Sequence, residues 1–107
     1  MTQQEIQERN EEIALMLGYI NITQTDKDFH IFEFPTKIGV IPSMIETMSM
    51  KFHSDWNWLM EAAKFMLDIV SKNDEMEVWY SFTDNIPDIE ICFVIVSDYA
   101  KVYNQSK

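Results

Sequence analysis

The side chains with the greatest chemical reactivity in this chain are two histidines and one cysteine, and their spacing forms no catalytic or metal-binding motif. His30, His53 and Cys92 lie far apart in the sequence. None belongs to a His-x-x-x-His, Cys-x-x-Cys or carboxylate–histidine pattern, the spacings that bind zinc or activate a nucleophile. The two glycines, Gly18 and Gly39, are too few for a phosphate-binding loop. The sequence therefore predicts a protein that is not an enzyme and that uses no cofactor or metal.

Acidic side chains are the most informative charged feature of the chain. Its 107 residues include 18 Asp and Glu but only 8 Lys and Arg, which gives a formal net charge of −10. Residues 73–100 contain no Lys or Arg at all. This charge disfavours direct binding to nucleic-acid phosphates and to anionic membranes, because both depend on basic side chains. The acidic segment is either a solvated flank or a surface for a basic partner.

The second interpretation predicts a candidate partner-binding surface. Its carboxylates would dock into a positively charged groove, such as the nucleic-acid channel of a nuclease, and would mimic a phosphate backbone there. Binding of this kind weakens as salt is added. The candidate contact residues are Asp74, Glu75, Glu77, Asp84, Asp88 and Glu90.

Two alternative functions remain open at this stage. Trp56, Trp58 and Trp79 can form an aromatic platform, which predicts a small-ligand or nucleotide-binding module. Core packing is the other explanation for these three side chains. The remaining alternative is a self-assembling accessory protein, which would form a homodimer through an exposed apolar patch.

A long apolar segment near the middle of the chain predicts the helix around which the other elements are arranged. Residues 54–72 contain no Gly or Pro, and Ser54 is a suitable N-cap. Two neighbouring apolar rows leave only a narrow polar stripe, so this helix should be covered on most sides. The first row consists of Trp56, Met60, Ala63, Leu67 and Val70.

The N-terminal third predicts a helix followed by a hairpin. Residues 2–17 have helical apolar spacing, with Thr2 as a capping residue and Gly18 as a left-handed terminator. Residues 19–23 and 29–34 alternate between apolar and polar side chains around a polar turn, which predicts two antiparallel strands.

The remaining segments complete the predicted order. Residues 38–41 favour a short third strand, and residues 43–50 favour either one or two helical turns or an irregular segment. Residues 76–82 alternate and predict a strand. A 3-4-3-4-3 apolar spacing runs from Ile86 to Tyr103 and predicts a helix, whereas the rival alternation stops after Ile95.

These elements predict one α+β domain over residues 1–107. Its architecture would be a small antiparallel sheet of three or four strands that is covered or sandwiched by three helices. The single cysteine excludes an intramolecular disulfide, and the first eight residues lack the basic and apolar regions of a secretion signal. We therefore expect a cytoplasmic protein.

Three blocks of the sequence resemble a known group of proteins. They are residues 15–19 (Leu-Met-Leu-Gly-Tyr), residues 51–60 (Lys-Phe-His-Ser-Asp-Trp-Asn-Trp-Leu-Met) and residues 89–104. Together they resemble the small α-β-α sandwich proteins found in phages and in prophage regions of bacteria, notably Bacteroidetes. The resemblance implies a layered fold and a C-terminal helix, and it transfers no functional residues because the group has no established common chemistry.

The phage-type resemblance also implies a class of partner. Small acidic phage proteins often bind and block a host protein, including defence nucleases such as CRISPR effectors. Combined with the charge, this gives the leading hypothesis of a non-enzymatic, anti-CRISPR-like interaction protein. It would bind a basic protein in the host cytoplasm and inhibit a nucleic-acid-dependent defence complex.

Overall fold

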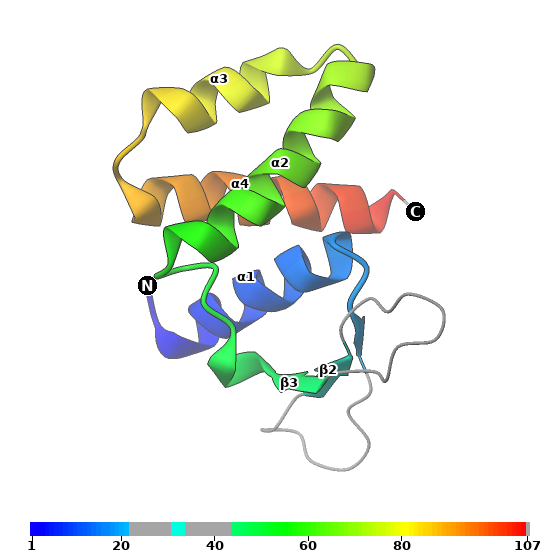
Figure 1. The fold of residues 1–107 in the computed structure, drawn as a ribbon, viewed down its shortest axis with the longest axis vertical. Helices are drawn as coiled ribbons and strands as arrows, with labels where there is room; N and C mark the ends of the chain where they lie inside the picture. The colour runs from blue at the N-terminus through cyan, green and yellow to red at the C-terminus, as the bar shows by residue number, and fades with distance from the viewer. Residues whose placement is uncertain (22–30, 34–43, 107) are drawn as a thin grey trace.

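The computed structural model describes residues 1–21, 31–33 and 44–106. These residues form helices and a three-stranded antiparallel sheet, so the predicted α+β class is confirmed. In Figure 1 the sheet lies at one edge of the helices and α3 at the opposite edge. The elements are α1 (Gln3–Met16), β1 (Ile20–Asn21), β2 (Ile31–Glu33), β3 (Met44–Glu46), the 3-10 helix η1 (Thr47–Ser49), α2 (Trp56–Lys72), α3 (Met76–Asp84) and α4 (Ile89–Gln105).

Helix α4 is the element against which the other helices pack. It contacts α1, α2 and α3, and its longest contact is with α1, which runs alongside it (Figure 1). The apolar pattern of residues 54–72 predicted this central place for the segment that forms α2, whereas α2 packs against α3 and α4. The fully buried side chains that α4 contributes to the core are Cys92, Phe93, Val96 and Ala100.

The remaining core comes from three directions. Helix α1 supplies Ile13, Ala14 and Met16, and α2 supplies Leu59, Ala62, Ala63, Met66 and Val70. The sheet contributes Phe32, and the connection between the sheet and α2 contributes Met50 and Phe52. Helix α3 contributes a single fully buried side chain, Phe82.

The sheet has the strand order β1-β2-β3. Ile20 pairs with Glu33 and Asn21 with Phe32, which confirms the predicted antiparallel hairpin for the part of it that the structure describes. The third strand forms at 44–46, where helical turns or an irregular segment had been predicted, and a helical turn follows as η1. The strand predicted at 38–41 lies outside the described residues.

The strand predicted at 76–82 is wrong, because this segment forms helix α3. Alternation had placed Trp79 on a polar side and Tyr80 on an apolar side. In the structure Trp79 stacks on Phe82, three residues later, with ring centroids 5.3 Å apart, and Tyr80 is 58% exposed. The apolar residues therefore follow the three-residue spacing of a helix. The protein accordingly has four α-helices among its described residues instead of the three predicted.

Side-chain caps and left-handed residues fix the ends of the helices. The Thr2 hydroxyl accepts a hydrogen bond from the Glu5 amide at 3.1 Å, as predicted. Helix α2 is capped by Asp55, whose carboxylate accepts from the Asn57 amide at 2.8 Å, so the predicted cap at Ser54 is wrong by one residue.

The left-handed residue at the end of α1 is Gly18, as predicted. Gly18 has φ 95°, and the following Tyr19 amide donates to the Ala14 carbonyl at 2.9 Å. Asp74 takes the same role after α2 with φ 58°, and the Glu75 amide donates to the Val70 carbonyl at 2.9 Å. Both are helix-terminating motifs in which a residue with a Cβ atom is sterically disfavoured.

Substitutions at Gly18 and Asp74 should change the free energy of unfolding in opposite directions. Gly18→Ala places a Cβ atom in the left-handed region and should lower the free energy of unfolding by about 1–2 kcal/mol. Asp74→Gly relieves the same strain and should raise it by about 0.5–1 kcal/mol. Urea denaturation followed by circular dichroism measures both. Equal effects of the two substitutions in the same direction would contradict the assigned conformations.

Candidate functional site

The six candidate acidic residues gather at the two ends of α3. Asp74 and Glu75 lie in the turn between α2 and α3, and Glu77 lies in the first turn of α3. At the other end, Asp84 is the last residue of α3, and Asp88 and Glu90 begin α4. Helix α3 separates the two groups along the chain, and a short connection leads from its end to the start of α4 (Figure 1). A nine-residue helix is about 13 Å long, which sets the scale of the separation between them. We call these six residues the acidic surface.

The acidic surface is open to solvent. Five of its six side chains are exposed, and Glu75 is half-buried. None of the six forms an ion pair with a Lys or Arg among the described residues. Direct ion pairing within the described residues therefore does not neutralise these six carboxylates.

Helix stability explains some of these positions but not all of them. Asp88 is the N-cap of α4 and accepts a hydrogen bond from the Ile91 amide at 3.2 Å. Glu77 and Glu90 lie in first helical turns, where the helix dipole favours negative charge. Asp84 lies at the C-terminal end of α3, where the dipole disfavours it. The stability of α3 therefore gives no reason for a carboxylate at Asp84.

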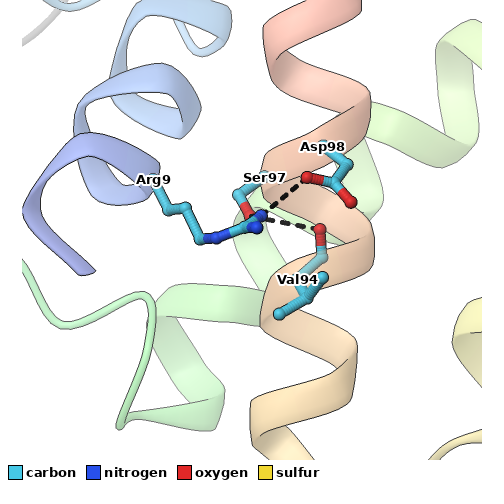
Figure 2. A network of polar contacts seen from close by, with 4 residues as sticks. All are labelled: Arg9, Val94, Ser97 and Asp98. Atoms are coloured by element: carbon cyan, nitrogen blue, oxygen red, sulfur yellow. Dashed lines mark hydrogen bonds and ion pairs between the residues drawn. The ribbon is translucent and has the colours of Figure 1, made fainter. Parts of the chain in front are cut away.

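A seventh acid in the same segment, Asp98, belongs to a different arrangement (Figure 2). The Arg9 guanidinium on α1 donates to the Asp98 carboxylate at 2.6 Å and to the Ser97 hydroxyl at 2.9 Å. The Ser97 hydroxyl donates in turn to the Val94 carbonyl at 3.1 Å. Asp98 is thus partly neutralised, and the network joins α1 to α4. Because Arg9 and Asp98 are 89 positions apart, no sequence spacing indicates this contact.

A cavity lies beside this network, between α1 and α4. Its volume is about 290 Å³, and its lining is strongly charged. The lining residues are Glu5, Glu8, Arg9, Glu11, Glu12, Ser97, Asp98 and Lys101. Within the described part of the chain, no group of three or more His, Cys, Asp or Glu side chains is arranged to hold a metal ion.

Among the cavities formed by the described residues, the one beside Trp58 is lined by neither Trp56 nor Trp79. A cavity of about 290 Å³ lies beside Trp58 and is lined otherwise by Tyr19, Asn57 and Glu61. Trp58 packs edge-on against Phe52 at a centroid distance of 5.1 Å, while Trp79 stacks on Phe82 in α3. Burial, assisted by the charge of Glu61, raises the pKa of Tyr19 to about 12, so its hydroxyl remains protonated at neutral pH.

His53 and Cys92 have packing partners within the fold. His53 Nδ1 lies 3.1 Å from the buried Asn10 Nδ2, and this amide can donate to Nδ1 when the ring is neutral with its proton on Nε2. Burial lowers the pKa of His53. The buried Cys92 thiol donates to the Phe82 carbonyl at 3.4 Å. Burial, and to a smaller extent the negative charge of Asp88, raises the pKa of this thiol. Its thiolate, the reactive form, is therefore disfavoured.

Comparisons with protein-family models, with curated proteins and with solved structures found no match for this chain. None of the described helices has the length and apolar character needed to cross a membrane.

The environment of His53 predicts a specific pH dependence of stability. The unfolded chain binds a proton near the ordinary histidine pKa of 6.5, whereas the folded chain binds it only at lower pH. The free energy of unfolding should therefore fall as the pH drops below about 6.5, until it reaches the folded-state pKa.

The test compares urea denaturation from about pH 7 to about pH 5 with and without His53→Gln, in chains that both carry His30→Gln. The chain that retains His53 should lose more stability over this range. Identical pH profiles would contradict the buried neutral ring, as would an NMR titration that places the His53 pKa at or above 6.5.

Proposed function

We propose that this chain is a non-enzymatic interaction protein whose acidic surface binds a positively charged surface of a partner protein. The observation that carries the proposal is the set of largely exposed carboxylates at both ends of α3, none of which forms an ion pair with a Lys or Arg among the described residues. Charge complementarity of this kind raises association rates and selects the partner. It also makes the complex sensitive to salt, because exposed charges are screened.

A groove that ordinarily binds nucleic acid is the partner surface that best fits this arrangement. Helix α3, which lies between the two acidic groups in the chain, is about 13 Å long. This is similar to the width of the DNA major groove, about 12 Å, which phosphates border on both sides. Carboxylates at both ends of α3 can therefore contact basic side chains of the partner that normally bind the phosphates of both strands of a DNA duplex.

The proposed partner class is a host defence nuclease. The resemblance to small phage and prophage proteins supports a host protein as the target, and the charge supports a nucleic-acid-binding one. Occupation of its basic groove would exclude DNA or RNA and so inhibit cleavage. We place this interaction in the host cytoplasm, where such nucleases act on nucleic acid.

Asp84 adds a separate argument for binding. A carboxylate at the C-terminal end of a helix typically costs a few tenths of a kcal/mol to about 1 kcal/mol. Asp84 therefore makes α3 less stable, and a role in binding a partner would account for its presence at this position.

A matched pair of charge reversals tests the proposal. The surface variant carries Glu77→Lys, Asp84→Lys and Glu90→Lys. The control variant carries Glu5→Lys, Glu8→Lys and Glu61→Lys, three exposed acids outside the acidic surface. Both change the net charge equally, and Glu5 matches the surface variant in losing an acid from a first helical turn.

The immobilised proteins are compared by capture from lysate of bacteria that carry CRISPR systems, followed by mass spectrometry. The unmodified chain and the control should recover the same basic nucleic-acid-binding protein, and the surface variant should recover at least tenfold less. Equal recovery by both variants, with circular dichroism showing both folded, would exclude the acidic surface as the contact. Failure of the unmodified chain to recover any protein would contradict the proposed function.

A further inference from the structure

An apolar groove between α3 and α4 adjoins the acidic surface. Its volume is about 430 Å³, larger than the cavity beside Trp58. Helix α3 contributes Val78 and the acidic Glu77. Helix α4 contributes Ile95, Asp98, Tyr99 and Val102. The groove therefore has an apolar floor with one carboxylate from each helix in its walls.

The apolar side chains of this groove are accessible to a ligand. Val102 is 61% exposed, and Val78, Ile95 and Tyr99 are half-buried. The position of Val102 on α4 is otherwise unexplained, because it contributes little to the core. An exposed apolar side chain gains free energy when a partner covers it.

Charge connects the groove to the acidic surface. Glu77 belongs to both, and Glu75 lies close enough to Tyr99 to act electrostatically on its hydroxyl. Asp98 keeps a carboxylate at the α4 wall, although Arg9 neutralises part of its charge. A ligand that enters the groove therefore passes carboxylates on its way to the apolar floor.

This combination selects against a second copy of the chain. Two copies docked through this groove would bring together two linings that each carry Glu77 and Asp98. The net charge of −10 on each chain adds long-range repulsion. A ligand with positive charge beside its apolar side chains meets no such penalty.

We propose that the α3–α4 groove binds an amphipathic helix of the basic partner, with apolar side chains on the groove floor and Lys or Arg beside Glu77 and Asp98. A helix supplies apolar side chains at i, i+3, i+4 and i+7, the pattern with which helices occupy grooves of this kind. The inference rests on the proposed function and adds to it the chemical character of the contacting segment. The apolar contact also gives the complex a component of affinity that salt does not screen.

Synthetic peptides of about 14 residues test the groove by NMR titration of the ¹⁵N-labelled chain. The first peptide has Leu at i, i+3, i+4 and i+7 and Lys elsewhere. The second replaces each Leu by Ser, and the third replaces each Lys by Glu. The first should bind at least tenfold more tightly than the others and shift the amide signals of Val78, Ile95, Tyr99 and Val102.

Two substitutions on the same helix provide the matched control. Val102→Ser removes an exposed apolar side chain from the groove, and Ile91→Ser removes one, 44% exposed, from outside it. Val102→Ser should weaken binding of the Leu–Lys peptide at least threefold, while Ile91→Ser leaves it unchanged. Equal effects of the two substitutions, or signal shifts confined to other surfaces, would overturn the inference.

The charge-reversal variants separate this inference from the proposed function. If the first and second peptides bind the unmodified chain equally, the groove inference fails. If binding of both is also weakened by the surface variant and not by the control variant, the acidic surface remains supported. If the surface and control variants weaken peptide binding equally, the acidic surface itself is not a selective site and the proposed function fails.

Discussion

The fold depends on the burial of α4 against three other helices. Its inward residues, Cys92, Phe93, Val96 and Ala100, are fully buried, and burial of a large apolar side chain contributes about 1.5–3 kcal/mol. The Arg9–Asp98 ion pair beside them is partly exposed, at 29% and 64%, and contributes at most about 1 kcal/mol. Packing therefore holds the helices together. The polar contacts, including the Asn104 amide that donates to the Glu12 carbonyl at 2.9 Å, fix how α1 aligns with α4.

This distribution of stability leaves α3 free to carry charge. Phe82 is its one fully buried side chain, Met76, Val78 and Trp79 pack half-buried against the core, and the other five residues of α3 are exposed. The turns at its two ends bring Asp74 and Asp88 to the surface together with their acidic neighbours. A short helix with few core contacts can also tolerate Asp84 at its C-terminal end. The acidic surface and the apolar groove are thus both consequences of an α3 that lies on the outside of the core.

The sequence predicted the long elements better than the short ones, for a physical reason. The apolar spacing at 89–103 covers more than four turns, over which helical and alternating patterns diverge. The nine residues of α3 cover between two and three turns, and Met76, Val78, Tyr80 and Phe82 fit alternation equally well. The acidic residues were identifiable from composition, but their grouping at the ends of a helix was not, because the segment between them had been read as a strand. The α3–α4 groove was missed for the same reason.

The central claim is that exposed carboxylates provide the main attraction to a basic partner, and salt dependence of binding tests it most directly. The dissociation constant of the captured complex can be measured by calorimetry from about 50 mM to about 400 mM NaCl, over which the Debye length shortens severalfold. We predict that the affinity falls at least tenfold across this range. The remaining affinity at high salt would reflect apolar contact. An affinity that stays constant or rises with salt would contradict the claim and assign the attraction to apolar surfaces alone.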